Sequence, residues 1–400
     1  MTDRLYYIDS YCRTFDAVVT RAFEHDGRPA VTLSRTAFYP SSGGQPADRG
    51  TLASASILDV IDAGEVVHVI SSPLSGSTRV AAEVDWARRF DHMQQHTGQH
   101  LLSAAFDRIF ENPTVGFHLG PEIVTIDLAR EATAADIDRA VDEANGVVWE
   151  NRAVSIRFVS PAEAATLGLR KEPARTGTIR LIEIDGFDLC ACGGTHVKST
   201  GAVGLIAALG WERQRGGTRL TYVCGTRARR ADREHRAAVA GSVRVLSVLP
   251  AELPSAVEKL HGEARQLRKR LDDLGAELAA FEGARLGAAA PEVAGVRVVM
   301  AVVEGSPAGL KRLAAAVVGA GPACAVLVCG AQPLAVVVGC AKGVPVDAAA
   351  VLRELIARFG GRGGGKPDLA QGGGLAAPAD DVLSAARAIV ENTLRGAAAE

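Results

Sequence analysis

The residues best suited to chemistry in this 400-residue chain are two pairs far apart in the sequence. His96 and His100 are four positions apart, as are Cys192 and His196. On a helix, side chains at this spacing project from one face about one turn apart, so His96 and His100 can grip one ion. Three neutral imidazoles and a thiolate are donors that Zn²⁺ accepts in a tetrahedron. The sequence therefore predicts a zinc site on these four residues.

The spacing of the second pair strengthens the prediction. Gly193 and Gly194 lie between Cys192 and His196 and allow a turn tight enough for both side chains to converge. A histidine pair alone is more often structural, but the two halves together are a strong signal. The residues leave open whether such a site is catalytic or purely structural, because catalytic zinc usually keeps one coordination position open.

The elements that must position these residues form an α+β protein with four predicted domains. Residues 1–90 predict a small β-barrel, with strands at 30–34, 56–61, 65–70 and 78–84. The segment from Phe38 to Gly50 is rich in glycine and proline, which predicts a loop between strands.

Residues 91–225 predict a second domain, which would carry all four candidate ligands. Apolar periodicity predicts helices over 91–110 and 132–149. Strands are predicted over 155–159, 178–184, 204–209 and 218–224. Helices beside an antiparallel sheet make an α+β domain.

Residues 226–286 predict a helical arm, interrupted at Pro250 and Pro254. Apolar residues follow spacings of four and three over about four heptads, which predicts a coiled coil between two chains or within a helical hairpin. They are Leu253, Val257, Leu260, Ala264, Leu267, Leu271, Leu274, Leu278 and Phe281.

Residues 292–400 predict a C-terminal α/β domain with a glycine-rich loop at 360–374. Apolar runs at 296–303, 323–329 and 334–340 predict its strands. The loop carries no Gly-Lys-Ser/Thr sequence, so it predicts no nucleotide site of the Walker type.

Composition excludes several classes of protein. A hydrophobic fraction of 48% supports folded cores, and the net charge of -2 gives no overall sign of nucleic-acid binding. Seven cysteines are too few and uneven for a secreted disulfide scaffold. The first residues lack the apolar core of a signal peptide. The apolar stretch 322–340 is interrupted at Gly330, Gln332 and Pro333, which favours two strands over a membrane span. We expect a cytoplasmic protein without a membrane partner.

Three motifs together carry a family resemblance that covers nearly the whole chain. The segments 96–102 and 192–197 resemble the paired zinc motif of the alanyl-tRNA synthetase editing domain and its free-standing relatives, the AlaX proteins. The segment 38–48 is similar to the glycine-rich motif of the preceding barrel. The segment 364–373 is similar to a loop of the synthetase C-terminal domain, which is usually reached through a coiled coil.

The resemblance implies a zinc-dependent hydrolase. No aminoacylation domain precedes the barrel in this sequence, so the chain looks like a long-form AlaX protein. Such a protein hydrolyses the ester of mischarged tRNA(Ala), chiefly Ser-tRNA(Ala), with Gly-tRNA(Ala) as a second candidate. A pocket for alanine rejects serine or glycine by only about 1 to 3 kcal/mol, so a second hydrolytic site is the general remedy. Zinc there could polarise the ester, anchor the substrate or activate water, and the sequence leaves these roles open.

Further residues are predicted to belong to the site, and some of them have an alternative role. Gln99 either points into the pocket or faces away. The resemblance implies that Gln45 is a contact that shapes substrate access. Asp127 either orients a zinc ligand or is a solvated strand carboxylate. The candidate tRNA contacts are Arg215, Arg219 and Lys366, since affinity for RNA rests largely on charge.

Two other functions fit the same residues. One is a tRNA-binding or dimerisation module with a purely structural zinc site, and the other is an unrelated zinc amidase or esterase. A homodimer through the coiled coil or the C-terminal domain fits any of the three. The sequence identifies neither the preferred amino acid nor a general base.

Overall fold

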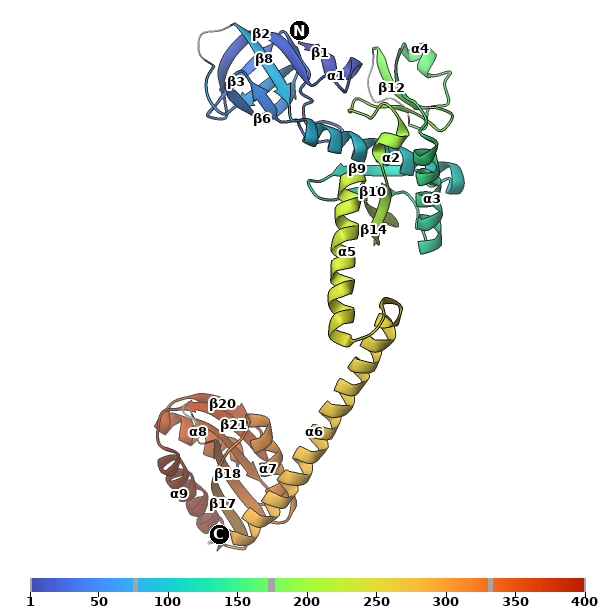
Figure 1. The fold of residues 1–400 in the computed structure, drawn as a ribbon. Coiled ribbons are helices and arrows are strands. Elements are labelled where there is room, and N and C mark those ends of the chain that lie inside the picture. Colours follow the sequence, from blue (N-terminus) through green and yellow to red (C-terminus); the bar gives the residue numbers. More distant parts are fainter. Residues whose placement is uncertain (1, 75–77, 172–176, 330–333, 399–400) are drawn as a thin grey trace. The chain divides into compact units, whose positions relative to one another are not determined.

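The computed structural model describes residues 2–74, 78–171, 177–329 and 334–398 (Figure 1). The chain divides into two compact units, Met1–Ser242 and Val243–Glu400. Each unit is a mixture of helices and sheet, as the α+β prediction required.

The first unit begins with a closed antiparallel barrel of six strands, drawn in blue in Figure 1. In barrel order the strands are β2 (Thr14–His25), β3 (Arg28–Leu33), β7 (Glu65–Ile70), β6 (Ala55–Ala63), β5 (Gly50–Leu52) and β8 (Arg79–Val84). Alternate residues such as Leu33, Val60 and Val80 fill its interior. The predicted barrel is confirmed, but the long strand β2 was missed because charged residues mask its alternation.

Three short elements precede or flank the barrel strands. The strands β1 (Asp3–Arg4) and β4 (Arg35–Thr36) pair in parallel, and the single-turn helix α1 (Leu5–Ile8) follows β1. The segment between β4 and β5 contains the predicted loop from Phe38 onward.

Helix α2 (Trp86–Phe110) starts directly after β8 and carries the first candidate pair. The Asp85 side chain accepts a hydrogen bond from the Arg88 amide and so caps its N-terminus. Helix α3 (Ala134–Glu150) begins with a capping box between Thr133 and Asp136, which caps its N-terminus. Both predicted helices are therefore present, with α2 starting earlier than expected.

Helices α2 and α3 pack against one face of a four-stranded antiparallel sheet. The strand order is β14 (Ile206–Gln214), β15 (Gly217–Cys224), β10 (Val124–Leu128) and β9 (Thr114–Leu119). Residues that alternate along the strands, such as Leu220 and Tyr222, face the helices and form the core.

A second, three-stranded antiparallel sheet supports the other half of the candidate site. It contains β11 (Val154–Val159), β12 (Ile179–Ile184) and β13 (Asp188–Ala191), with the short helix α4 (Pro161–Ala164) packed beside it. Strand β13 was not predicted, because four residues are too few to show alternation. It leads directly into Cys192 and is followed by a 3-10 turn at Thr200–Val203.

Two long helices correspond to the predicted arm. Helix α5 (Gly225–Leu246) follows β15, and α6 (Leu253–Ala289) follows a 3-10 turn at Pro250–Glu252. The apolar seam of α6 is exposed within the described residues, including Leu267, Leu271 and Leu278. A coiled coil needs a second helix on this seam, so that part stays a prediction.

The second unit contains a six-stranded sheet between helices (Figure 1). The strand order is β16 (Glu292–Val293), β17 (Val296–Val303), β18 (Ala323–Cys329), β19 (Leu334–Cys340), β21 (Leu369–Leu375) and β20 (Arg362–Gly365). Helix α7 (Pro307–Gly319) packs on one face, and α8 (Ala348–Phe359) and α9 (Ala379–Ala397) pack on the other. Only β17 and β18 pair in parallel, so the sheet is mixed rather than the parallel sheet typical of an α/β domain.

The predicted glycine-rich loop is largely a strand pair, so that prediction is wrong in its local structure. Strands β20 and β21 pair antiparallel, and the turn between them contains Lys366. A Cβ atom at Gly363 would lie 2.4 Å from the Gln371 carbonyl oxygen, and one at Gly365 would lie 2.3 Å from the Ala370 Cα. At these two positions the strands approach so closely that only glycine fits. The run of glycines has no side-chain alternation for sequence analysis to detect.

The apolar stretch 322–340 forms the antiparallel neighbours β18 and β19, and the turn predicted at 330–333 lies outside the described residues. In the described part of the chain, no single helix has the length and apolarity needed to cross a membrane. Helices α5 and α6 pass that test only as a bent pair, by length and composition.

Candidate metal centre

The structure brings the four predicted ligands together in the first unit. The ligand atoms of His96, His100, Cys192 and His196 all lie within 4.8 Å of one another. Helix α2 supplies the first two, and the segment after β13 supplies the others. The three histidines are buried and Cys192 is half-buried.

Each histidine of this cluster is held through its Nδ1 atom. The three contacts are His96 to Gln45 Oε1 at 2.8 Å, His100 to Asp188 Oδ2 at 3.0 Å, and His196 to Thr97 Oγ1 at 3.1 Å. Such contacts fix the orientation of each ring and leave its Nε2 atom available to face a cation. The arrangement is typical of metal-binding histidines.

The donor separations fit a tetrahedral zinc ion. Cys192 Sγ lies 3.4 Å from His96 Nε2 and 3.4 Å from His196 Nε2. Zinc bonds of roughly 2.0 to 2.3 Å in a tetrahedron place neighbouring donors about 3.3 to 3.6 Å apart. The residues present therefore fit Zn²⁺ in both donor type and spacing.

The electrostatics favour the forms that bind metal. Burial lowers the pKa of His96 to about 3, and burial also lowers the pKa of His196 well below its usual value, so both imidazoles are neutral. Burial alone would raise the pKa of Cys192, but His100, the Gly194 amide and the Arg180 charge outweigh it and lower this pKa. Neutral imidazoles and a thiolate are the protonation states that zinc requires.

Asp188 is a charged residue that holds one of the clustered histidines in place. Burial would raise the pKa of Asp188, but hydrogen bonds from His100 and Arg170 outweigh burial and lower it to about 2. Arg170 forms two hydrogen bonds to this carboxylate, at 2.7 and 3.0 Å. Asp188 therefore stays ionised and is fixed in place to accept the His100 Nδ1 proton.

The glycine-rich segment of the barrel reaches the cluster through Gln45. Its Nε2 donates to Thr195 Oγ1 at 2.8 Å, and the Thr195 amide donates to its Oε1 at 3.2 Å. These contacts fix the amide so that Oε1 faces the His96 Nδ1 atom. Gln45 therefore positions a candidate ligand, a more specific role than the predicted contact shaping substrate access.

A buried ion pair joins the same segment to helix α2. Arg89 Nε lies 3.0 Å from Asp48 Oδ2, and both side chains are fully buried. Asp48 also accepts a hydrogen bond from the Tyr39 amide at 2.6 Å, and Arg89 Nη1 donates to the Ser10 carbonyl at 2.8 Å. These bonds hold the segment carrying Gln45 against the helix carrying His96.

Gly194 makes room for the first histidine. A Cβ atom at this position would lie 2.2 Å from His96 Cε1 and 2.4 Å from His96 Nδ1. At Gly193 a Cβ atom would meet only the Tyr7 side chain, with the nearest atom, Oη, at an ordinary 3.7 Å. Of the two glycines, Gly194 is therefore the one required by packing at the cluster.

A cavity of about 370 Å³ opens beside the cluster. His96, Cys192, Gly193 and Gly194 line it. The remaining wall is aromatic, apolar or polar and includes Tyr7, Tyr39, Phe158, Ile179 and Arg180. A molecule in this cavity lies against two of the four candidate ligands.

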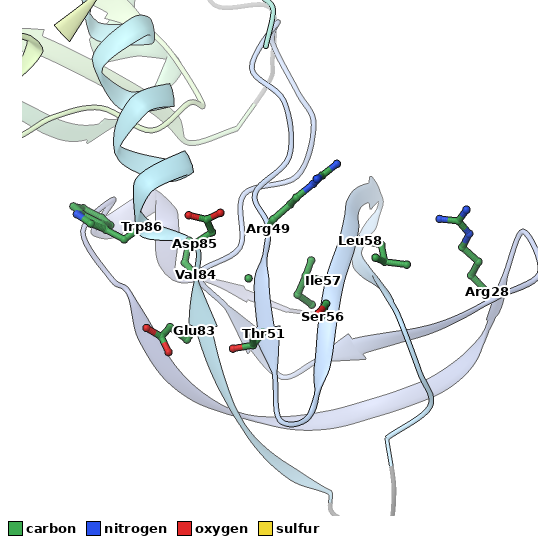
Figure 2. A pocket seen from close by; sticks show the side chains of 11 residues that line it. Arg28, Arg49, Thr51, Ser56, Ile57, Leu58, Glu83, Val84, Asp85 and Trp86 are labelled. Carbon is green, nitrogen blue, oxygen red and sulfur yellow. The ribbon is translucent and has the colours of Figure 1, made fainter. Parts of the chain in front are cut away.

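A separate groove of about 630 Å³ lies on the barrel (Figure 2). Its lining includes Arg28, Arg49, Thr51 and Trp86, and none of the four clustered residues. Figure 2 shows Asp85 at the start of α2, where it caps the helix. The groove is therefore separate from the cluster and contributes none of its donors.

Two predicted site residues have other contacts. Gln99 Nε2 donates to Ser103 Oγ at 2.8 Å, and the described lining of the cavity does not include Gln99. Of the two alternatives for Asp127, the contacts favour a strand carboxylate over one that orients a ligand, because its carboxylate pairs with Arg219 at 2.7 and 2.9 Å. Asp188, which sequence analysis missed, contacts a ligand histidine instead.

The candidate tRNA contacts lie in different environments. Arg215 is exposed in the turn between β14 and β15, with a left-handed φ of 49°. The charge of Arg219 is offset by Asp127. Lys366 is exposed in the turn between β20 and β21.

Comparison with known proteins gives two kinds of match. The family described as "Threonyl and Alanyl tRNA synthetase second additional domain" matches residues 179–221. The chain is 31% identical to the alanyl-tRNA editing protein AlaX-L of Pyrococcus horikoshii over 93% of this chain and 94% of that protein. It is 36% identical to the alanine–tRNA ligase of Halobacterium salinarum over 96% of this chain, but it spans only 44% of that enzyme.

Similar solved structures include a domain of an alanyl-tRNA synthetase. The C-Ala domain of Aquifex aeolicus alanyl-tRNA synthetase is 27% identical, covering 26% of this chain and 96% of that domain, with a TM-score of 0.24.

Proposed function

Because the chain belongs to the family of alanyl-tRNA editing proteins, we propose that it is a zinc-dependent deacylase of mischarged tRNA(Ala). Its preferred substrate in this proposal is Ser-tRNA(Ala), with Gly-tRNA(Ala) second. The reaction is hydrolysis of the ester between the amino acid and the terminal ribose.

The opening of the cluster into a cavity is the observation that carries the proposal. A purely structural zinc site is normally closed by its four protein ligands. Here His96 and Cys192 line a space of about 370 Å³. That space gives an aminoacyl group a place beside the metal-binding donors, which a dimerisation module does not need.

The four clustered residues would hold the ion, and the surrounding residues would keep them in place. When bound, zinc would supply a Lewis acid beside the ester carbonyl. Gln45, Asp188 and Thr97 hold the three imidazoles in their binding orientation. Burial keeps His96 and His196 neutral, and the lowered pKa of Cys192 favours its thiolate form.

The substrate choice follows from what an alanine-activating site cannot do. Serine differs from alanine by one hydroxyl group and glycine by one methyl group. A hydrophobic pocket discriminates such differences by only about 1 to 3 kcal/mol. A separate hydrolytic site that accepts these esters and spares the alanyl ester corrects the resulting errors.

Two further parts of the proposal concern partners. Arg215 and Lys366 are exposed and suited to phosphate, so we assign them to tRNA contact. The exposed seam of α6 is suited to a second copy of the same helix, so we assign a homodimer to it.

A panel of charged tRNAs tests the proposed function. Purified protein is incubated with tRNA(Ala) carrying serine, glycine, alanine or threonine, with and without a zinc chelator. We expect the seryl ester to disappear first, the alanyl ester to survive, and the chelator to stop hydrolysis until zinc is restored. Full activity in metal-free protein, or no hydrolysis of any ester, would contradict the proposal.

The variant His100→Ala separates a catalytic site from a structural one. We expect it to lose hydrolysis while circular dichroism and thermal unfolding show that the fold remains. Loss of the fold with loss of zinc would instead favour a structural metal site. Rapid turnover of small esters without tRNA would favour an unrelated zinc esterase.

A further inference from the structure

Arg180, in strand β12, has one donor atom that the protein does not use. Its side chain lines the cavity beside the cluster and the residue is only 8% exposed. Nε donates to the Tyr7 carbonyl at 2.9 Å, and Nη1 donates to the Cys192 carbonyl at 2.7 Å. Nη2 is buried and has no hydrogen-bond partner among the described residues. An unsatisfied buried donor on a charged group carries a desolvation cost that a ligand could remove.

The other buried arginines of the described chain are neutralised by carboxylates. Arg89 pairs with Asp48, and Arg227 forms three hydrogen bonds to Asp91. The partially buried Arg170 pairs with Asp188. Arg180 instead bonds only to main-chain carbonyl groups, although its environment is equally dry. The usual requirement that a buried charge be paired is therefore not met at this position by the protein itself.

The cavity around Arg180 has no acidic side chain among its described lining residues. Its wall consists of aromatic, apolar and small polar residues together with His96 and Cys192. The acidic group that acts most strongly on Arg180 is the Cys192 thiol, which a bound metal would use as a thiolate. An oxygen with negative charge is therefore the ligand that complements this part of the cavity.

We propose that Arg180 is a substrate-binding residue whose Nη2 atom donates a hydrogen bond to an anionic oxygen of the bound substrate. This inference rests on the proposed deacylase function. Two oxygens of the substrate have that chemistry: a phosphate oxygen of the terminal nucleotide, and the former carbonyl oxygen as it takes negative charge. Water adds to the ester carbon, the bond to the ribose oxygen breaks, and a proton from the water goes to that ribose oxygen.

The two oxygens are distinguished with a hydrolysis-resistant probe. The probe is adenosine carrying serine through an amide at the 3′ position, prepared with and without a 5′-phosphate. Binding is measured by calorimetry to the zinc-loaded protein and to Arg180→Lys and Arg180→Gln. If Nη2 binds phosphate, both variants lose about 10- to 100-fold in affinity for the phosphorylated probe and little for the other.

If Nη2 stabilises the developing oxyanion, the binding of both probes stays within a factor of two. In that case kcat for Ser-tRNA(Ala) falls by roughly 100-fold while KM is unchanged. The same fall in kcat is then expected for the seryl ester of adenosine, which has no phosphate.

Controls separate these effects from a loss of structure. Arg227→Lys changes an equally buried arginine whose charge is paired, and it should leave both probe binding and kcat unchanged. Zinc content and thermal unfolding are measured for every variant. If both Arg180 variants lose zinc, or if neither changes affinity or kcat by more than twofold, the inference is wrong.

The outcome also separates this inference from the proposed function. If unsubstituted protein hydrolyses Ser-tRNA(Ala) and the Arg180 variants change neither probe affinity nor kcat, only the role of Arg180 is contradicted. If unsubstituted protein does not hydrolyse this ester but binds the phosphorylated probe through Arg180, the deacylase function is contradicted. The role of Arg180 in binding an anion is then retained.

Discussion

At the scale of single residues, the candidate centre depends on partners that hold each imidazole. Asp188 is the only carboxylate described in contact with a ligand histidine, and Arg170 fixes it from the other side. A carboxylate behind a metal-bound histidine raises the basicity of the ring and sets its orientation. Asp188 should therefore control metal affinity without being a ligand.

The variant Asp188→Asn tests this role. The amide is a weaker acceptor for the His100 Nδ1 proton, so we expect zinc affinity to fall about 10- to 100-fold. Competition with a chromophoric chelator measures the change. Asp127→Asn is the matched control, because its carboxylate pairs with Arg219 instead, and it should leave zinc affinity unchanged. Equal effects of the two substitutions would contradict the assignment.

Sequence analysis found the four clustered residues because their types and spacing are distinctive even without a structure. It missed Asp188, Thr97 and Arg180, whose importance depends on contacts between segments distant in the chain. It left the role of Asp127 open, because a strand carboxylate near a metal motif looks the same in either environment. Pairing between distant residues is the information that a single sequence does not carry.

At the scale of elements, the site depends on the close approach of helix α2 and the turn after β13. Gly194 lies where a Cβ atom would overlap the His96 ring. The turn also has to bring Cys192 and His196 to the same point, and a shift of either element would separate the donors.

The variant Gly194→Ala should therefore displace His96. We expect a loss of stability of about 1 to 3 kcal/mol from overpacking, together with weakened zinc binding. Chemical unfolding and zinc stoichiometry measure the two effects. Gly193→Ala adds the same methyl group one residue earlier, where the nearest atom is 3.7 Å away, and should retain zinc. Retention of full zinc affinity by Gly194→Ala would show that the turn adjusts freely.

Elements were predictable where side chains carry a clear pattern. The apolar runs 296–303, 323–329 and 334–340 coincide with β17, β18 and β19. Strand β20 consists of one arginine and three glycines, so its pairing is set by main-chain contact and has no hydrophobic signal. The strand β13 is too short for any period to emerge.

At the scale of the whole molecule, the exposed seam of α6 is the feature on which the proposed homodimer rests. Leu267, Leu271 and Leu278 are 62%, 70% and 64% exposed. Fully burying such a side chain contributes about 1.5 to 3 kcal/mol, so several together favour association. The heptad spacing makes a second copy of the same helix the natural occupant.

Sedimentation velocity tests the homodimer. We expect the unsubstituted chain to sediment as a dimer and the double variant Leu271→Glu with Leu278→Glu to sediment as a monomer, because the charges disrupt the seam. Lys269→Glu, on the same helix but off the seam, should remain dimeric. A monomeric unsubstituted chain at micromolar concentration would contradict the homodimer.

The most direct test of the central claim is a zinc titration of metal-free protein, followed by the rate of Ser-tRNA(Ala) hydrolysis. If the four clustered residues form one catalytic centre, the rate rises in proportion to added zinc and stops rising at one ion per chain. His96→Ala protein should show no such rise. A full rate before any zinc is added, or a rate that zinc binding leaves unchanged, would contradict the claim.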